Sequence, residues 1–186
     1  MKILAFGDSL TSGYGLPPGE GFTDQLNQAL KDQGVNAKII NGGVAGDTTA
    51  DGLSRLDWSL ADDPAVVIVE LGGNDALRGL DPAATKKNLD AILTKLQQQH
   101  RAILLAGMLA PPNLGSDYAA SFNPIFADLA KQHQVTLYPF FLDGVAGNPS
   151  LVQPDGIHPT AQGVAIIVQR LLPSLHEAID RARATD

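Results

Sequence analysis

The sequence predicts an α/β fold of three layers (α/β/α), with a five-stranded parallel sheet between two layers of helices. Short apolar stretches of strand length alternate five times with segments whose apolar residues follow helical spacing. The stretch 65–69 is apolar on both faces, as is typical of a central parallel strand. No repeat or linker interrupts the alternation, so we expect one domain over residues 1–186. Five such units suit the flavodoxin-like strand order 2-1-3-4-5.

The first half of the chain supplies the first three strands. Residues 3–6 and residues 37–40 are short apolar runs that precede the central strand. Between these two runs, apolar residues recur at helical spacing over residues 22–33, and Gly34 is suited to end that helix. A second helix is expected around residues 53–60, where leucines are three and four positions apart.

The second half continues the alternation. Apolar residues at i, i+3, i+4 and i+7 predict a helix over residues 89–96, and residues 102–107 form the fourth strand. The proline-containing segment 108–117 is predicted to be a loop. The next helical face covers residues 122–129, where Pro124 either starts the helix or kinks it.

The chain ends with one more strand and one more helix. Residues 135–138 are the fifth strand, and residues 139–154 are mostly irregular. The last helix carries apolar residues from Val164 to Leu175, and Pro173 is expected to bend it.

Composition narrows the class of protein. Of 186 residues, 44% are hydrophobic and 18% are charged, which is ordinary for a globular domain. The net charge of −7 and the lack of a basic stripe argue against nucleic acid and anionic membranes as partners. The chain has no cysteine, so disulfides and thiolate chemistry are excluded, and no apolar run is long enough to predict a membrane span. No signal peptide is visible, which indicates a cytoplasmic protein unless a leader was removed from a periplasmic or secreted one.

The stretch 6–13 is the focus of the functional prediction. Ser9 stands just past the first strand, at the carboxyl edge where ligands collect in open parallel sheets. Three other loops are expected to open on the same edge and carry Gly46, Asn74 and the segment 155–159.

These loops offer one candidate for each role in a serine hydrolase. His158 is the natural base, because imidazole titrates near neutral pH, and Asp155 is close enough to orient it. Gly46 can present a bare backbone N–H, and the neutral Asn74 amide can donate to an oxyanion. Each residue taken alone has a simpler interpretation as a turn former, so the argument depends on their combination.

The remaining polar residues near these motifs receive structural interpretations. Asp8 is interpreted as a turn or helix-capping residue, and Asp75 as holding its own loop. Glu70 is unusual at the end of a buried strand, with Arg78 as a possible partner. The remaining histidines are scattered, so no metal site is expected.

Together these motifs resemble the SGNH hydrolases, the GDSL family of esterases and lipases. The matching blocks are residues 7–10, Gly46, residues 72–75 and residues 155–158, in the family's order. The likeness is greatest to the compact bacterial branch of thioesterases, lysophospholipases and arylesterases. The resemblance implies Ser9 as nucleophile and backbone oxyanion donor, with no cofactor.

We therefore expect a serine hydrolase that cleaves carboxylic esters of small molecules, with acyl thioesters or lysophospholipids as further substrates. The apolar side chains Leu109, Pro111 and Leu114 of the fourth loop are the candidate acyl pocket, which predicts short to medium acyl chains. One alternative is a carbohydrate O-deacetylase that uses the same residues. The other is a flavodoxin-like anion-binding module, which would leave Asn74 and His158 without a role. The sequence predicts no oligomeric state.

Overall fold

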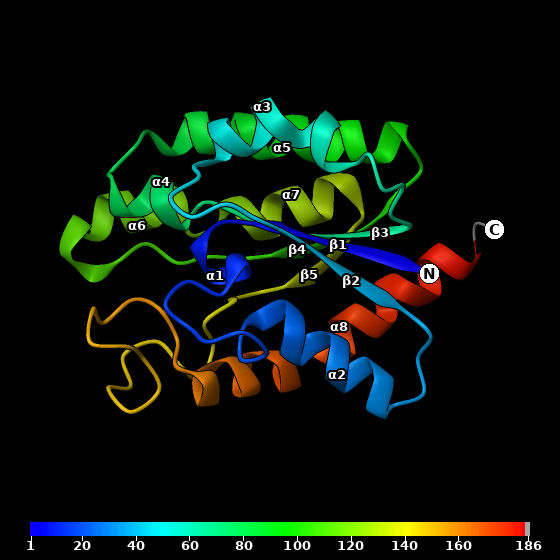
Figure 1. Cartoon of the computed structure of the whole chain (residues 1–186). Helices are drawn as coiled ribbons and strands as arrows, with labels where there is room; N and C mark the ends of the chain where they lie inside the picture. Colours follow the sequence, from blue (N-terminus) through cyan, green and yellow to red (C-terminus); the bar gives the residue numbers. More distant parts are fainter. Residues whose placement is uncertain (185–186) are drawn as a thin grey trace.

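The apolar stretches form one parallel sheet in the computed structural model, which describes residues 1–184 (Figure 1). The strand order is β2-β1-β3-β4-β5, which confirms the predicted winding. Each pair of neighbouring strands runs parallel, so the loops that follow the strands open at the same edge. The strands are β1 (Lys2–Gly7), β2 (Lys38–Gly43), β3 (Val66–Glu70), β4 (Ala102–Ala106) and β5 (Thr136–Tyr138).

Helices cover both faces of the sheet, as the three-layer prediction requires (Figure 1). One face is covered by α2 (Phe22–Asp32) and α8 (Ala161–Ala184). The other face is covered by α3 (Thr49–Ser59), α5 (Pro82–Gln98) and α7 (Ile125–His133). Each of these helices contains residues that the sequence analysis placed in a helix.

Two short helices were not predicted. They are α1 (Ser9–Ser12) and α4 (Gly73–Leu77), which directly follow β1 and β3 and which sequence analysis treated as turns. Four or five residues are too few to show helical periodicity, and only α1 has a side-chain cap at its start. In α1, the Asp8 side chain accepts a hydrogen bond from Leu10 N–H at the start, and Gly13 ends the helix in the left-handed region.

The loop predicted over residues 108–117 is shorter than expected. It contains a 3-10 turn at Pro112–Leu114, and α6 (Ser116–Phe122) already begins within it. Pro124 starts α7 rather than kinking a single longer helix, since α6 and α7 are separate. Pro173 lies inside α8 and does not end it.

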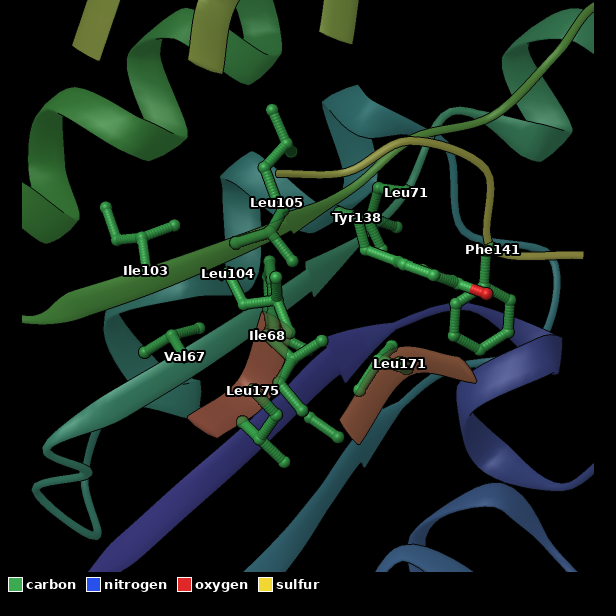
Figure 2. Close-up of a cluster of buried hydrophobic side chains, with 14 of the residues drawn as sticks. Val67, Ile68, Leu71, Ile103, Leu104, Leu105, Tyr138, Phe141, Leu171 and Leu175 are labelled. Atoms are coloured by element: carbon green, nitrogen blue, oxygen red, sulfur yellow. The ribbon is translucent and has the colours of Figure 1, made fainter. Parts of the chain in front are cut away.

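The core is built around β3, whose five residues are all buried to 0% exposure. Ile68 of β3 pairs in register with Leu104 of β4, so both side chains point to the same face. Figure 2 shows Ile68 gathered with Leu171 and Leu175 of α8, which lie one helical turn apart. Burying side chains of this size stabilises the fold by about 1.5–3 kcal/mol each.

A glycine lets α1 lie directly on the end of β2. A Cβ atom at Gly43 would stand 2.3 Å from Ser12 N and 2.8 Å from Asp8 O. Both neighbours are backbone atoms, so they cannot move aside without shifting α1 itself. The position of α1, and of Ser9 at its start, therefore depends on the missing side chain at Gly43.

We predict that Gly43→Ala lowers the free energy of unfolding by about 3 kcal/mol, because the added methyl forces α1 away from β2. Urea unfolding of the variant measures the loss. Gly34→Ala is the matched control: Gly34 has φ of +72° but no atom near its Cβ position, so only backbone strain of about 1 kcal/mol is expected there. Equal losses in the two variants would show that α1 does not press on Gly43.

Candidate active site

The structure brings together the residues that the sequence analysis singled out at the carboxyl edge of the sheet. Ser9 begins α1 after β1, Gly46 lies in the loop after β2, and Asn74 lies in α4 after β3. His158 arrives from the irregular segment between β5 and α8. All four line one cavity of about 720 Å³.

Ser9, His158 and Asp155 form a continuous chain of hydrogen bonds. Ser9 Oγ lies 2.8 Å from His158 Nε2, and His158 Nδ1 lies 2.6 Å from Asp155 Oδ2. An imidazole held by a carboxylate at Nδ1 keeps its other nitrogen free to accept a proton from the serine hydroxyl.

The backbone around Asp155 keeps its carboxyl ionised. Asp155 Oδ1 accepts hydrogen bonds from the N–H groups of Ile157, at 2.9 Å, and His158, at 3.0 Å. The Ile157 N–H, together with the bonds from His158, lowers the pKa of Asp155 to about 2. Asp155 is therefore an anion at neutral pH, and it holds the imidazole ring and the backbone of His158 at the same time.

The Gly46 backbone is turned so that its two polar groups have different surroundings. Its φ is +87°, a conformation that glycine adopts without strain. The Gly46 carbonyl accepts a hydrogen bond of 2.6 Å from Arg78 Nη2, while its N–H has no partner within residues 1–184. Arg78 therefore anchors the loop and leaves one backbone donor available beside Ser9.

The Asn74 amide is held from two sides. Its Nδ2 donates to Asp8 Oδ2 at 2.9 Å and to Asp47 O at 2.9 Å. Two acceptors at fixed positions determine the orientation of the amide plane. Asn74 is thus a rigidly placed donor on the wall of the cavity.

Comparisons with known proteins agree with this geometry. A sequence model of the GDSL-like lipase/acylhydrolase family matches residues 5–166. The chain is 38% identical over 176 residues to Esterase TesA of Pseudomonas aeruginosa, and the match covers 94% of this chain and 88% of that protein. It is 34% identical over 179 residues to Thioesterase 1/protease 1/lysophospholipase L1 of Escherichia coli, covering 96% and 85%. The chain belongs to the GDSL-like lipase/acylhydrolase family.

A solved structure supports the same assignment. AlinE4, an SGNH-hydrolase family esterase, matches with a TM-score of 0.81 and 50% sequence identity, and the match covers 95% of each chain. The resemblance inferred from the motifs is therefore confirmed, as is the fold. The chain is an ester-hydrolysing serine hydrolase of the SGNH type.

Most of the apolar wall of this cavity comes from two loops. One follows β4 and includes the candidate pocket residues Leu109 and Pro111. The other is the first part of the irregular segment after β5, residues 139–154, which the sequence analysis had not connected with the site. Leu114 does not line the cavity and faces Gly79 instead. The apolar lining residues of the two loops are Met108, Leu109, Ala110, Pro111, Pro112, Phe140, Leu142, Ala146 and Val152.

Three acidic residues next to the motifs behave differently from their sequence interpretation. Asp8 does cap α1, but its second oxygen also binds Asn74, which a residue adjacent to Ser9 was not expected to do. Asp75 does not hold its own loop: it accepts hydrogen bonds from Thr49 N–H and Oγ1 and from Thr85 Oγ1, and so ties α4 to α3 and α5. The expected Glu70–Arg78 pair is wrong, because Thr11 Oγ1 donates to Glu70.

Two residues at the site were missed by sequence reasoning. The ring of Tyr14 lies 4.6 Å from that of His158, tilted by 41°. Gln153 Nε2 donates to Tyr14 O and to Pro159 O, both at 2.9 Å, and Gln153 N–H donates to His158 O at 2.7 Å. The only sequence signal for Gln153 is its place two residues before Asp155. Its role could not be predicted, because its partners Tyr14 and Pro159 are far apart in the chain.

Neither a cluster of metal ligands nor a membrane-spanning helix is found in the part of the chain that the structure describes. Within residues 1–184, no group of three or more His, Asp or Glu side chains is placed to hold a metal ion. Over the same residues, no helix combines the length and the apolar character needed to cross a bilayer.

We predict that Gln153→Ala lowers kcat/KM about 10- to 100-fold, because the loop carrying His158 loses its link to the loop carrying Tyr14. Steady-state kinetics on an aryl ester measure the change. Gln25→Ala is the matched control, since Gln25 Nε2 also bridges two carbonyls, Glu20 O and Ala161 O, away from the cavity. Equal losses in the two variants would assign the effect to general loosening of the loops.

Proposed function

We propose that this esterase acts through an acyl-enzyme on Ser9, with His158 as general base and Asp155 as the group that orients His158. The observation that carries the proposal is the unbroken chain from Ser9 Oγ through the imidazole to the Asp155 carboxylate, with links of 2.8 Å and 2.6 Å. Both links are within the reach that proton transfer requires.

In the first step, Ser9 Oγ attacks the acyl carbonyl carbon while its proton passes to His158 Nε2. The imidazolium that forms is stabilised by Asp155, which remains an anion because its pKa lies at about 2. The proton is then delivered from Nε2 to the leaving alcohol. The acyl group is left on Ser9.

The negative charge on the tetrahedral intermediate is stabilised by the N–H groups of Ser9 and Gly46 and by the Asn74 amide. The Gly46 N–H is without a partner in residues 1–184, which supports this role. Asn74 Nδ2 already donates to Asp8 and Asp47, so the oxyanion has to share an N–H with one of these acceptors. The strength of the Asn74 donor therefore depends on Asp8.

In the second step, His158 removes a proton from water, which attacks the acyl-Ser9 carbonyl and releases the acid. The same three donors stabilise the second tetrahedral intermediate. Nucleophile, base and donors all come from the chain itself, so this mechanism uses no cofactor.

The substrate we propose is a small-molecule ester with an acyl chain of short to medium length, and an acyl thioester is the second substrate class. The apolar walls from the loops after β4 and β5 support an acyl chain rather than a sugar. A carbohydrate O-deacetylase needs polar groups and aromatic platforms for sugar hydroxyls and rings. Within residues 1–184, the aromatic side chains that line the cavity besides His158 are Tyr14 and Phe140.

We predict that Ser9→Ala and His158→Ala each lower kcat by about 10⁴-fold or more, and that the double variant is little worse than either. A serine-reactive organophosphonate should label the wild-type protein at Ser9 and leave Ser9→Ala unlabelled. Ser12→Ala is the matched control, because Ser12 belongs to the same short helix and its hydroxyl donates to Ser9 O. Losses that multiply, or labelling that persists in Ser9→Ala, would contradict the proposal.

We predict that Leu109→Ala and Leu142→Ala flatten the rise of kcat/KM with acyl length, because each buried methylene contributes roughly 0.8 kcal/mol. A series of aryl esters from acetyl to decanoyl measures the effect, and acetyl-ester turnover should change little. Leu114→Ala serves as the control, since Leu114 does not line the cavity. If Leu114→Ala alters the profile as strongly as Leu142→Ala, the acyl chain lies elsewhere.

A further inference from the structure

A second acid lies buried behind the active site. Glu70 ends β3 and has 0% exposure, and Asp8 beside it has 2% exposure. Glu70 Oε2 accepts hydrogen bonds from Thr11 Oγ1 at 2.8 Å and from Asp8 N–H at 3.4 Å. None of the steps described above uses Glu70.

The surroundings of Glu70 do not suit a carboxylate. Its Oε1 is buried and has no hydrogen-bond partner within residues 1–184. No cation pairs with Glu70 in the same range, because Arg55 binds Asp47 Oδ2 at 2.6 Å and Gly7 O at 2.9 Å. An unpaired buried anion with an unsatisfied oxygen is costly, and a neutral acid avoids most of that cost.

The electrostatics point the same way. Burial, and then the nearby Asp8 charge, raise the pKa of Glu70 well above its usual value. Burial raises the pKa of Asp8 to about 6, against the lowering effects of the Leu10 N–H, of a hydrogen bond from Glu70 and of His158. Asp47 is the other acidic group that acts on Asp8. One proton is therefore retained by the pair. Glu70 is the member placed to keep it, because the Asp8 carboxyl has donors in Leu10 N–H and Asn74 Nδ2, whereas Glu70 Oε1 has none within residues 1–184.

Asp8 connects Glu70 to the residues of the active site. Its Oδ1 accepts from Leu10 N–H at 2.9 Å and so caps the helix that begins with Ser9. Its Oδ2 accepts from Asn74 Nδ2 at 2.9 Å. A change in the place or charge of the Asp8 carboxyl alters the Asn74 amide directly.

The backbone also leaves room for Glu70 at this point. A Cβ atom at Gly7 would stand 2.2 Å from Thr11 Oγ1 and 2.6 Å from Glu70 Oε2. The Glu70 carboxyl therefore lies against the end of β1, next to Asp8, only because residue 7 is a glycine.

We propose that Glu70 is a positioning residue that works as a neutral acid: its Oε2 binds the Thr11 hydroxyl and the Asp8 N–H, and Asp8, so placed, holds the Asn74 amide for the oxyanion. The inference rests on the proposed role of Asn74 in the oxyanion hole. It gives Asp8 the negative charge of the pair and Glu70 the proton. The Asn74 amide then faces an acceptor of fixed position and charge.

The first test compares Glu70→Leu, which removes the acceptor of the Thr11 and Asp8 hydrogen bonds, with Glu70→Gln, which keeps a neutral acceptor there. We expect kcat to fall roughly 10- to 100-fold in Glu70→Leu with KM unchanged, since the full loss of an oxyanion donor costs about 10²–10³-fold. Glu70→Gln should restore kcat to within about threefold of wild type. Thr136→Val is the control for removing a buried polar group, because Thr136 lies on β5 and binds Glu177.

The second test measures Tm against pH for Glu70→Gln and wild type, and it applies even if Glu70→Leu does not fold. A proton retained by Glu70 in the folded chain but released on unfolding makes wild type lose stability as pH rises above about 4.3. The Tm advantage of Glu70→Gln should therefore grow by about 3–5 °C per pH unit up to the pKa of folded Glu70. Asp8, Asp47, Arg55 and His158 are present in both proteins, so their titration contributes mainly to the shared part of the two curves.

The outcomes separate this inference from the proposed function. A pH-independent Tm difference, or a folded Glu70→Leu with wild-type kcat, overturns the role of Glu70. If wild-type protein is not labelled at Ser9 by an organophosphonate, the proposed function itself fails. Labelling of wild type together with a kcat loss in Glu70→Leu, its recovery in Glu70→Gln and the rising Tm difference supports both.

Discussion

The hydrogen bond between Ser9 Oγ and His158 Nε2 joins residues 149 positions apart in the chain. It forms only because the segment before α8 returns over the end of β1, where it is tied to the loop of Tyr14 by Gln153. The strand order adds the other partners, since β1 lies between β2 and β3, whose following segments carry Gly46 and Asn74. Placing the nucleophile after this strand therefore puts one proposed oxyanion donor on each side of it.

The sheet edge beneath the site is unusually rich in buried acids. Asp8, Glu70 and Asp75 are each at most 2% exposed, yet none of them has an Arg or Lys partner within residues 1–184. Asp75 is satisfied by hydroxyl and backbone donors from Thr49 and Thr85, which fix α4 against its neighbours. Such buried polar groups are costly, and the apolar core around β3 supplies the stability that offsets them. The bonds of Asp75 hold α4 in place against α3 and α5, and Asn74 lies in this helix.

The chemistry and the walls of the cavity come from different parts of the sheet. The segments after β1, β2 and β3 carry Ser9, Gly46 and Asn74, whereas most of the apolar wall comes from the loops after β4 and β5. His158 belongs to the catalytic group but comes from the segment after β5, directly after the residues that form the second apolar wall. Substitutions in the walls can therefore change the cavity without touching the groups that carry protons or oxyanion contacts.

The sequence by itself determined the fold class, the strand order and the five residues of the proposed catalytic site. Buried parallel strands are continuous apolar runs, and Ser9, Gly46, Asn74, Asp155 and His158 stand in short local motifs. The tertiary structure alone decided the partners of Glu70, Asp75 and Gln153 and the second wall of the cavity. These features depend on contacts between segments far apart in the chain, and no local pattern records which side chains meet there. Helices α1 and α4 were missed for a related reason, because one turn is too short to show a period.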